Sequence, residues 1–488
     1  MSREMFAVKI NQTQLEYDVN SIVKAFYPGE MIQVLTPDVS EEKRREWEDK
    51  IRMDICLDEN SARISVTDGE ERKEYNWKNN PQGGICKNEF KKFFYQTLCS
   101  ITGKKLPWGN LTGIRPTKIA MGLLEEEKTD AQIMEAMETE HFVSEEKAAL
   151  SVEIAKRERQ LLSHIHYENG YSLYIGIPFC PTTCLYCSFP SNPICKWKDK
   201  VETYIDCLMK EMVHTAEMMQ GRILDSVYIG GGTPTTLDAG QLDRLLTAIE
   251  KNFDLSTVQE FTVEAGRADS ITEDKLKVLC AHGVGRISVN PQTMKPETLK
   301  LIGRQHTVEQ VKEAFYLARK TGSFHINMDI ILGLPDEKEE DVANTIAEIK
   351  KLQPDSLTVH SLAIKRASRL AQWIQENGIT TLHNTDETMR IAAQGAKDMG
   401  MHPYYLYRQK NMSGNFENVG YAKEGEDGIY NILIMEEKQT ILALGAGSIT
   451  KRVFPDGRIE RSENVKDVAS YIERIDEMIE RKRRLFEE

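Results

Sequence analysis

The central part of the chain alternates between short apolar runs and amphipathic segments. The apolar runs predict six strands, at 172–179, 226–232, 261–266, 286–290, 325–333 and 356–364. In the gaps, apolar residues recur with helical spacing, which predicts helices at 199–219, 239–253, 272–283, 307–322 and 339–352. Strands that alternate with helices form a parallel α/β sheet with right-handed crossovers, either open or closed into a barrel. In both arrangements, functional side chains gather at the carboxyl ends of the strands.

The segment before this pattern predicts a separate α+β region. Residues 43–59 and 130–165 are helical in character, and residues 61–69 predict a strand with a turn. Between them, Pro116 predicts the first turn of a helix after a Gly-containing loop. Thr112 and Arg115 in that loop either contact a ligand or belong to a capped helix entry that packs on the next domain.

The pattern changes again after about residue 400. Residues 404–428 are polar, aromatic and Gly-rich, which predicts loops. Two strands are predicted at 429–435 and 439–447, followed by a charged helix at 465–488. We therefore expect an N-terminal α+β domain at 1–165, an α/β domain at 166–400 and a C-terminal extension at 401–488 that covers the active site.

Length, charge and composition argue against several classes of protein. A length of 488 residues suits about three domains at roughly 150 residues each. The formal net charge of −13 argues against a protein that mainly grips nucleic acid, which requires a basic surface. No run approaches the roughly 18 apolar residues of a membrane span, and the N-terminus lacks a signal-peptide pattern. These features predict a cytoplasmic protein.

Three of the nine cysteines lie within eight residues, directly after the first predicted strand. Cys180, Cys184 and Cys187 have the spacing C-x3-C-x2-C, and three thiolates on one loop can hold three corners of a [4Fe–4S] cluster. The fourth iron then has no protein ligand and is open to a small molecule. A structural zinc site would need a fourth ligand, for which Cys195 is the close candidate. A redox disulfide fits less well, because such pairs usually have C-x2-C spacing.

The sequence around these cysteines resembles the radical S-adenosylmethionine (SAM) superfamily, whose fold is a partial (β/α)6 barrel. The motifs YIGIPFCPTTCLYCSF, GGGTPTTL, FTVEAGR, RISVNPQTM, LIGRQHT and INMDIILGLP occur in the order found in oxygen-independent coproporphyrinogen III oxidases, most similarly in the HemZ type (coproporphyrinogen dehydrogenase). This resemblance covers about residues 170–335. It implies two cofactors, a [4Fe–4S] cluster and SAM.

The resemblance also implies roles for single residues. Those placed at SAM are Tyr174, Gly231, Gly232, Thr233, Glu264, Gln292, Arg304 and Asp329. The glycines and Thr233 would hold the methionine amino group, and Glu264 and Arg304 would pair with the ammonium and carboxylate. Gln292 and Asp329 would contact the ribose hydroxyls, although Asp329 could instead cap backbone; in an apolar strand it should have a polar partner. Tyr174 would lie near the sulfonium and the substrate as a catalytic residue.

The implied reaction is the oxidative decarboxylation of two propionates, which converts coproporphyrinogen III to protoporphyrinogen IX in anaerobic heme biosynthesis. An external donor such as flavodoxin or ferredoxin would reduce the cluster. Cationic candidates for the substrate's propionates are Lys365, Arg366, Arg369 and Arg408. Cys195 and Cys207 are interpreted as small buried apolar residues, and His360 as either a pocket residue or a core histidine.

Two departures from the oxidase pattern keep other functions open. Gly176 occupies the position at which the family has His. The family also has a fourth cysteine, at C-x-C spacing after the third ligand, where this chain has Ser188 and Phe189. Heme chaperones of the HemW type share the barrel and also lack that cysteine. A heme chaperone, a radical SAM enzyme acting on another tetrapyrrole and a zinc-binding structural protein are therefore the alternatives.

Overall fold

The computed structural model describes residues 5–28, 30–59, 61–69, 71–78, 86–113, 115–189, 191–365, 368–378, 382–409 and 416–487. The chain divides into two compact units. The first consists of Met1–Ala155, Asn377–Ile379 and Arg408–Glu417, and the second of Lys156–Glu376, Thr380–Tyr407 and Asn418–Glu488. The predicted domain borders at 165 and 400 stay a prediction.

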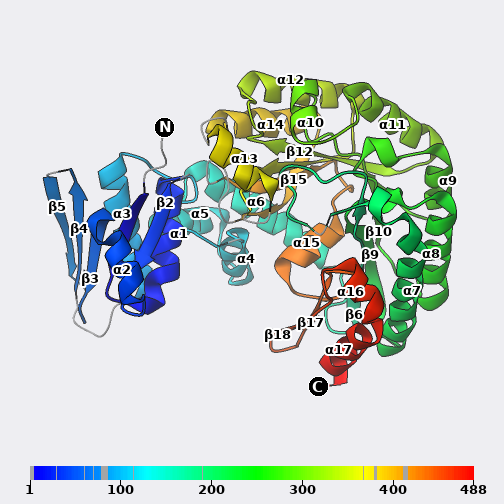
Figure 1. Ribbon diagram of the computed structural model, residues 1–488, viewed down its shortest axis with the longest axis horizontal. Coiled ribbons are helices and arrows are strands. Elements are labelled where there is room, and N and C mark those ends of the chain that lie inside the picture. Colours follow the sequence, from blue (N-terminus) through cyan, green and yellow to red (C-terminus); the bar gives the residue numbers. More distant parts are fainter. Residues whose placement is uncertain are drawn as a thin grey trace. The chain divides into compact units, whose positions relative to one another are not determined.

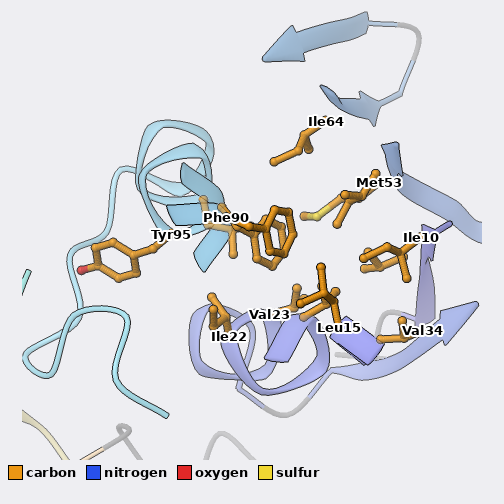
Figure 2. Packing of buried hydrophobic residues seen from close by; sticks show 14 of the residues in the cluster. Ile10, Leu15, Ile22, Val23, Val34, Met53, Ile64, Phe90 and Tyr95 are labelled. Carbon is orange, nitrogen blue, oxygen red and sulfur yellow. The ribbon is translucent and has the colours of Figure 1, made fainter. Parts of the chain in front are cut away.

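The first unit contains a five-stranded sheet in the order β2-β1-β3-β4-β5. Its strands are β1 (Met5–Ile10), β2 (Met31–Leu35), β3 (Ile51–Leu57), β4 (Ser61–Asp68) and β5 (Glu71–Lys78). Helix α1 (Glu16–Phe26) joins the parallel pair β1 and β2, and α3 (Lys87–Thr102) follows the sheet. Apolar side chains from the strands and both helices form one core, in which Phe90 and Phe94 stack at 5.7 Å (Figure 2).

The helix expected over residues 43–59 is wrong in its second half. Helix α2 spans only Glu41–Trp47, a short 3-10 turn follows, and Ile51–Leu57 forms strand β3. The reason is a change of period: Met53, Ile55 and Leu57 are buried at every second position, which is the pattern of a strand. The strand and turn predicted at 61–69 are confirmed by β4.

The helices expected later in this region are confirmed. Pro116 directly precedes α4 (Thr117–Glu125), and residues 130–165 form α5 (Asp130–His141) and α6 (Glu145–Leu162). The Nε1 atom of Trp108 donates to Glu417, 2.7 Å away, and Lys147 lies 2.8 Å from the same carboxylate. These buried contacts anchor the loop before α4 within the first unit.

The second unit is built on six parallel strands in sequence order. They are β6 (Gly170–Ile177), β9 (Ile223–Gly231), β10 (Glu260–Glu264), β11 (Arg286–Ser288), β12 (His325–Leu332) and β13 (Ser356–Ser361). All six predicted strands are thereby confirmed. The intervening helices are α7 (Val201–Met218), α8 (Ala239–Asn252), α9 (Glu273–Ala281), α10 (Pro296–Leu301), α11 (Val308–Thr321) and α12 (Glu339–Leu352), and they run along the outer side of the curved sheet (Figure 1).

The six strands form a partial barrel that continues into further strands at both ends. Strand β13 pairs antiparallel with β15 (Asn418–Ala422), which in turn pairs with β14 (His402–Tyr407). At the other end, β6 pairs in parallel with β16 (Thr440–Leu444), followed by β17 (Ile449–Val453) and β18 (Ile459–Glu463). The partial (β/α)6 barrel predicted from the sequence is thus confirmed.

Two expectations for the C-terminal part are wrong. Residues 404–428 were expected to be loops, yet β14 and β15 lie largely within them. The strand expected at 429–435 is helix α15 (Ile429–Glu436), whose Tyr430, Ile432 and Leu433 are buried. A short run that is apolar on all sides does not distinguish a buried helix from a buried strand. The second expected strand is β16, and the charged C-terminal segment forms α16 (Val468–Glu473) and α17 (Ile475–Glu487), as predicted.

A buried ion pair fastens α17 to the barrel. Lys482 on α17 contacts Glu211 on α7, and both side chains are fully buried. Glu211 also accepts hydrogen bonds from the backbone N–H of Gly445 (2.8 Å) and from the Tyr471 hydroxyl (2.6 Å). Within the described residues, no helix is both long and apolar enough to cross a membrane.

Candidate active site

The three clustered cysteines lie on the loop that follows β6. The loop is closed at its base by two short parallel strands, β7 (Phe179–Cys180) and β8 (Asn192–Pro193). Cys184 is 9% exposed, whereas Cys180 and Cys187 are half-buried. The backbone N–H of Leu185 donates to the carbonyl of Ile302, 2.9 Å away, and fixes the middle of the loop against the barrel.

The surroundings of the sulfur atoms suit a bound thiolate cluster. The Thr233 hydroxyl donates to Cys180 Sγ at 3.6 Å, and Arg267 Nη1 donates to Cys184 Sγ at 3.8 Å. Burial raises the pKa of the Cys180 thiol and raises that of Cys187 to about 11, so these thiols need a metal or a cation to ionise. The site therefore offers three sulfur ligands, and two of these sulfurs accept hydrogen bonds from Thr233 and Arg267.

Cys195 was the candidate fourth ligand of a structural zinc site. Cys195 is exposed and follows β8, so the interpretation of this residue as buried is wrong. Cys207 is half-buried, with its sulfur 3.8 Å from the carbonyl of Ile472. Across the part of the chain that the structure describes, no three His, Cys, Asp or Glu side chains are placed to hold a single metal ion.

The glycines at the end of β9 are required by close backbone contacts. Gly231 has a φ of +102°, and a Cβ on Gly232 would lie 2.5 Å from the carbonyl oxygen of Phe179. The N–H groups of Gly232 and Thr233 donate to the carbonyls of Ile177 and Phe179, at 2.8 and 2.7 Å. The strand end thus lies directly against the entry to the cysteine loop, as glycine alone permits.

Glu264, at the end of β10, is a half-buried side chain whose carboxyl group is surrounded by polar neighbours. It accepts hydrogen bonds from the Tyr228 hydroxyl and from the backbone N–H of Gly231. Burial raises the pKa of Glu264 to about 7, with nearby Asp329 adding to the shift. A carboxyl group with this pKa can ionise near neutral pH when a cation such as an ammonium group comes beside it.

Asp329 on β12 has the polar partners expected for it. The side-chain amide of Asn290 donates to Asp329 Oδ2 at 2.8 Å, and that of Asn327 donates to Oδ1 at 2.7 Å. The Asp329 N–H donates in return to Asn290 Oδ1 at 3.1 Å. His360 Nε2 lies 3.7 Å from Asp329 Oδ2, so His360 faces this group and not the core.

Gln292 has a strained backbone and an unpaired side-chain oxygen. Its φ is +67°, which is uncommon for a residue with a side chain, and its N–H donates to the Asp329 carbonyl at 2.9 Å. Gln292 is 7% exposed, and among the described residues its Oε1 atom has no hydrogen-bond partner. Strain together with an orphaned buried acceptor is typical of a ligand-binding position.

Arg304 is buried among the loops that follow β6, β10 and β11. Its Nη1 atom donates to the carbonyls of Asn290 (2.6 Å) and Gly266 (3.2 Å), and Nη2 donates to the Tyr186 hydroxyl (3.2 Å). Burial opposes its charge, but Tyr186 and Cys184 outweigh burial and raise the pKa of Arg304. A buried cation beside the cysteine loop can accept the carboxylate of a ligand.

Tyr174 on β6 belongs to a stack of three tyrosines inside the second unit. Its ring centroid lies 6.2 Å from those of Tyr228 and Tyr430, which are themselves 4.4 Å apart. A Cβ on Gly231 would lie 3.0 Å from the Tyr174 hydroxyl, so this hydroxyl reaches the glycine segment. The stack places aromatic ring surface next to Glu264, to which the Tyr228 hydroxyl donates.

The structure describes three of the four cations expected at the substrate, and their role there stays a prediction. Lys365 is half-buried, and burial lowers its pKa. Arg369 is exposed and donates to the Thr183 carbonyl on the cysteine loop. Arg408 belongs to the first unit, where it is buried, donates to the Leu111 carbonyl at 2.7 Å and lies over the Trp108 ring. Arg366 lies outside the described residues.

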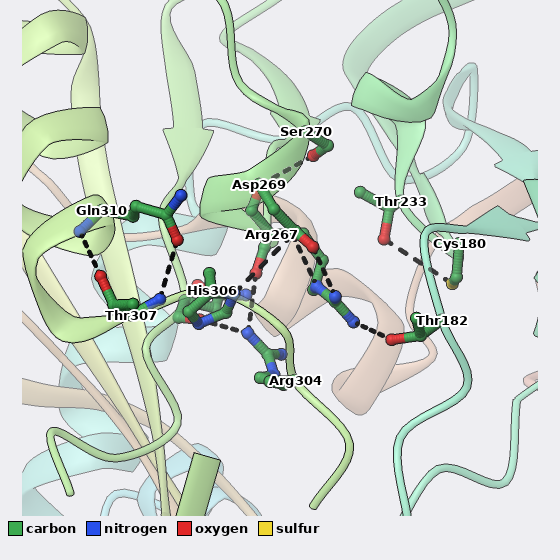
Figure 3. A network of polar contacts seen from close by, with 12 residues as sticks. Cys180, Thr182, Thr233, Arg267, Asp269, Ser270, Arg304, His306, Thr307 and Gln310 are labelled. Carbon is green, nitrogen blue, oxygen red and sulfur yellow. Dashed lines mark hydrogen bonds and ion pairs between the residues drawn. The ribbon is translucent and has the colours of Figure 1, made fainter. Parts of the chain in front are cut away.

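Sequence reasoning missed a polar network beside the cysteines (Figure 3). Arg267 follows Glu264 by three residues in the motif FTVEAGR and is held by Asp269 through two hydrogen bonds, of 2.9 and 2.7 Å. His306 Nδ1 lies 3.7 Å from Asp269. Burial would raise the pKa of Asp269, but the nearby His306 ring and the hydrogen bonds from Arg267 outweigh burial and hold that pKa below its usual value. Asn290, the partner of Asp329, was also missed.

Comparison with known proteins identifies the superfamily. Residues 174–349 match the radical SAM superfamily. The solved structure of Escherichia coli coproporphyrinogen III oxidase (HemN), described as a radical SAM enzyme, superposes with a TM-score of 0.52 at 22% identity, covering 66% of this chain and 72% of that one. This likeness shows a shared fold. The chain is a radical SAM protein, and that superfamily uses a [4Fe–4S] cluster and SAM.

The relatives define the family more narrowly. The oxygen-independent coproporphyrinogen-III oxidase-like protein HemZ of Bacillus subtilis is 40% identical over 407 residues, which cover 82% of this chain and 81% of HemZ. The heme chaperone HemW of Lactococcus lactis is 31% identical over 278 residues, covering 57% of this chain and 68% of that protein. The chain therefore belongs to the oxygen-independent coproporphyrinogen-III oxidase-like family that includes HemZ.

Proposed function

We propose that this protein is a coproporphyrinogen dehydrogenase, which converts coproporphyrinogen III to protoporphyrinogen IX by oxidative decarboxylation of two propionate side chains. The likeness to HemZ carries the proposal. It covers 82% of the chain, which is more than the second unit contains, so it extends into the first unit as well. The likeness to the HemW chaperone covers 57%, which the second unit alone can accommodate.

In this proposal the cluster is held by the three cysteines of the loop after β6. Cys180, Cys184 and Cys187 supply three thiolates and leave one iron open, as the C-x3-C-x2-C spacing predicts. The hydroxyl of Thr233 and the guanidinium of Arg267 donate to two of the sulfurs. With SAM beside a cluster held by these cysteines, the pair of cofactors would supply the radical chemistry that removes a hydrogen atom from a substrate carbon.

The residues at the strand ends bind and orient SAM. The ionised Glu264 carboxylate pairs with its ammonium group, and Arg304, whose described hydrogen bonds go to carbonyls and a hydroxyl, pairs with its carboxylate. Asp329, held from both sides by Asn290 and Asn327, presents its carboxylate to the ribose hydroxyls. The orphaned Oε1 of Gln292 accepts from the same ribose.

The tyrosine stack protects the reaction. Tyr174, Tyr228 and Tyr430 exclude water from the space beside Glu264, and a radical reaction requires this exclusion. Each substrate propionate loses one hydrogen atom from its β-carbon, then its carboxylate as CO2 and one electron to an external acceptor. The product of each turn is a vinyl group, and an external electron donor of the flavodoxin or ferredoxin type reduces the cluster between turns.

The test is product analysis under anaerobic conditions. Cluster-reconstituted protein is supplied with a reductant, SAM and coproporphyrinogen III, and vinyl products and 5′-deoxyadenosine are measured by chromatography. We expect both to form in wild type and in Cys195→Ala, whose exposed thiol lies outside the motif, and neither in Cys184→Ala. Nucleoside release without a vinyl product contradicts the proposed substrate.

A heme chaperone is the second candidate. Phe189 stands at the position of the fourth cysteine of the oxidase pattern, and its side chain is 70% exposed. Several HemW heme chaperones are also related to this chain, at 28–31% identity. Stable binding of heme by the cluster-loaded protein, with neither vinyl product nor nucleoside, would favour this function over the dehydrogenase.

A further inference from the structure

Arg267 is the one buried side chain whose described contacts join the cysteine loop, a carboxylate and the carboxyl end of β10. Its side chain is 4% exposed. The Nη1 atom donates to Thr182 Oγ1 at 3.0 Å and to Cys184 Sγ at 3.8 Å. The Nε and Nη2 atoms donate to the two oxygens of Asp269, at 2.9 and 2.7 Å, and so fix the plane of the guanidinium group (Figure 3).

The geometry around Arg267 is itself held in place from three sides. Ser270 donates to the Arg267 carbonyl at 2.7 Å, and Thr182, which accepts from Arg267, donates to the Gly303 carbonyl at 2.8 Å. The buried ring of His306 lies against the carboxylate of Asp269, with 3.7 Å between Nδ1 and Oδ1. A bidentate pair in a buried setting has little freedom to reorient. These contacts hold the guanidinium in the orientation in which Nη1 donates to the sulfur of Cys184.

Reduction places one additional negative charge beside this group. When a reductant delivers one electron to a [4Fe–4S] cluster, part of the new charge resides on the cysteine sulfurs. An N–H group that donates to such a sulfur, and a positive charge near it, stabilise the reduced form more than the oxidised form and raise the reduction potential. The low polarity of a buried site strengthens this effect, because water does not screen it.

We propose that Arg267 is a positioning residue that sets the reduction potential of the cluster through Cys184, with Asp269 fixing its orientation and partly offsetting its charge. This rests on the proposed function only in that Cys184 is a cluster ligand. It does not depend on the substrate, because the potential is a property of the cluster-loaded protein.

The two members of the pair make opposite predictions. Arg267→Met removes the donor and the positive charge but leaves Asp269 in place. We expect reduction to become at least about tenfold less favourable, which lowers the midpoint potential by about 59 mV for a one-electron couple. Asp269→Asn removes a negative charge and keeps the shape of the side chain, so the midpoint potential should rise. Arg267→Lys keeps the charge but loses the planar fork, and its potential should fall by less than that of Arg267→Met.

The measurement is a redox titration of reconstituted protein with dithionite and mediators, followed by electron paramagnetic resonance of the reduced cluster. Arg319→Met is the matched control, because it removes an arginine that pairs with Asp355, 2.7 Å away, at the amino ends of the strands. It should leave the potential unchanged. Opposite shifts in Arg267→Met and Asp269→Asn support the proposal.

Shifts of the same sign, or potentials equal to that of the wild type, overturn it, since a purely structural role would affect both variants alike. If Arg267→Met does not retain the cluster, Arg267→Lys and Asp269→Asn decide by the same criterion of opposite sign. Failure of coproporphyrinogen turnover leaves the titration readable, so the proposed function and this proposal fail separately.

Discussion

Glu264 shows how one side chain with a raised pKa can make cofactor binding depend on pH. Its pKa is raised to about 7, chiefly by burial, so at neutral pH the free site holds a mixture of carboxyl and carboxylate. Only the carboxylate attracts an ammonium group strongly. Protonation of Glu264 therefore competes with binding of the SAM ammonium group proposed for this position.

The sign of the pH dependence follows from the raised pKa. As pH falls below about 7, Glu264 takes up a proton that must leave before SAM binds, so affinity should fall by up to about tenfold per pH unit. Above about 7 the affinity should level off. The measurement is equilibrium dialysis of SAM against cluster-loaded protein over a range of pH.

Two variants identify the group responsible for this slope. Glu264→Gln should bind SAM more weakly and lose the dependence on pH. Glu260→Gln is the control, because Glu260 lies at the amino end of the same strand, where it accepts from the backbone N–H of Ile429. It should keep the slope of the wild type, and an unchanged slope in Glu264→Gln would contradict the assignment.

At this scale the sequence predicted some residues well and others not at all. The polar partner of Asp329 was predicted because an unpaired carboxylate in an apolar strand is costly. Arg267 was missed, since its partner Asp269 is two residues away and looks like an ordinary surface charge. Its approach to Cys184, 83 residues earlier, exists only in the folded chain.

Among the elements, the end of β9 is tightly constrained by backbone contacts. A Cβ on Gly232 would lie 2.5 Å from the Phe179 carbonyl oxygen and 2.7 Å from that of Ile177. Both neighbours are backbone atoms at the entry to the cysteine loop. They can move only if the loop moves with them.

Gly232→Ala should therefore disturb the loop and the fold together. We expect a loss of about 1–3 kcal/mol in the free energy of unfolding, as for other substitutions that force overlap in a packed region. Iron content after reconstitution should also fall. Gly240→Ala is the control, because Gly240 lies in α8 with its nearest neighbour, Asp238 Oδ1, at 3.4 Å, and alanine should be neutral or slightly stabilising there. Equal stability of the two variants would contradict the argument.

The helices and strands that were predicted correctly are those in which apolar residues recur at a regular spacing. The six parallel strands and the helices between them were found because apolar runs and helical spacing alternate for 190 residues or so. The errors fell at 43–59, where the period changes within one segment, at 404–428, where β14 and β15 lie in a polar and Gly-rich segment, and at α15, which is apolar on every side. Local patterns cannot separate these cases, because tertiary burial decides them.

At the scale of the whole second unit, the last helix is tied to the barrel by one buried charge pair. Lys482 and Glu211 are joined within a network that includes Asn464, which donates to Glu211 at 2.7 Å and accepts from Lys482 at 2.9 Å. Glu211 also binds the backbone of Gly445, in the loop after β16. Removing one partner leaves the other charge buried without compensation.

Lys482→Met should lower the free energy of unfolding by about 3–5 kcal/mol, because Glu211 keeps a buried charge. The double variant Glu211→Gln/Lys482→Met removes both charges and should recover much of that loss. Chemical denaturation monitored by circular dichroism measures both values. A double variant less stable than Lys482→Met would show that the pair is not the source of the effect.

The six parallel strands with helices between them followed from the sequence, and the partial barrel implied by the family resemblance agrees with their sequential order. The strands at the ends of the sheet did not follow. Strand β16 pairs with β6 across more than 260 residues, and β15 reaches β13 after two further helices. Such distant pairing leaves no local signal in the sequence.

Above all, we propose that Cys180, Cys184 and Cys187 together hold a [4Fe–4S] cluster with an iron open to SAM. Electron paramagnetic resonance of the reduced, reconstituted protein tests it most directly, together with iron analysis. We predict about four irons per chain and a spectrum that changes when SAM is added, in the wild type and in Cys195→Ala. Each of the three motif variants to alanine should lose the signal. A motif variant that keeps both the signal and its response to SAM, or a loss of the cluster in Cys195→Ala, would contradict the claim.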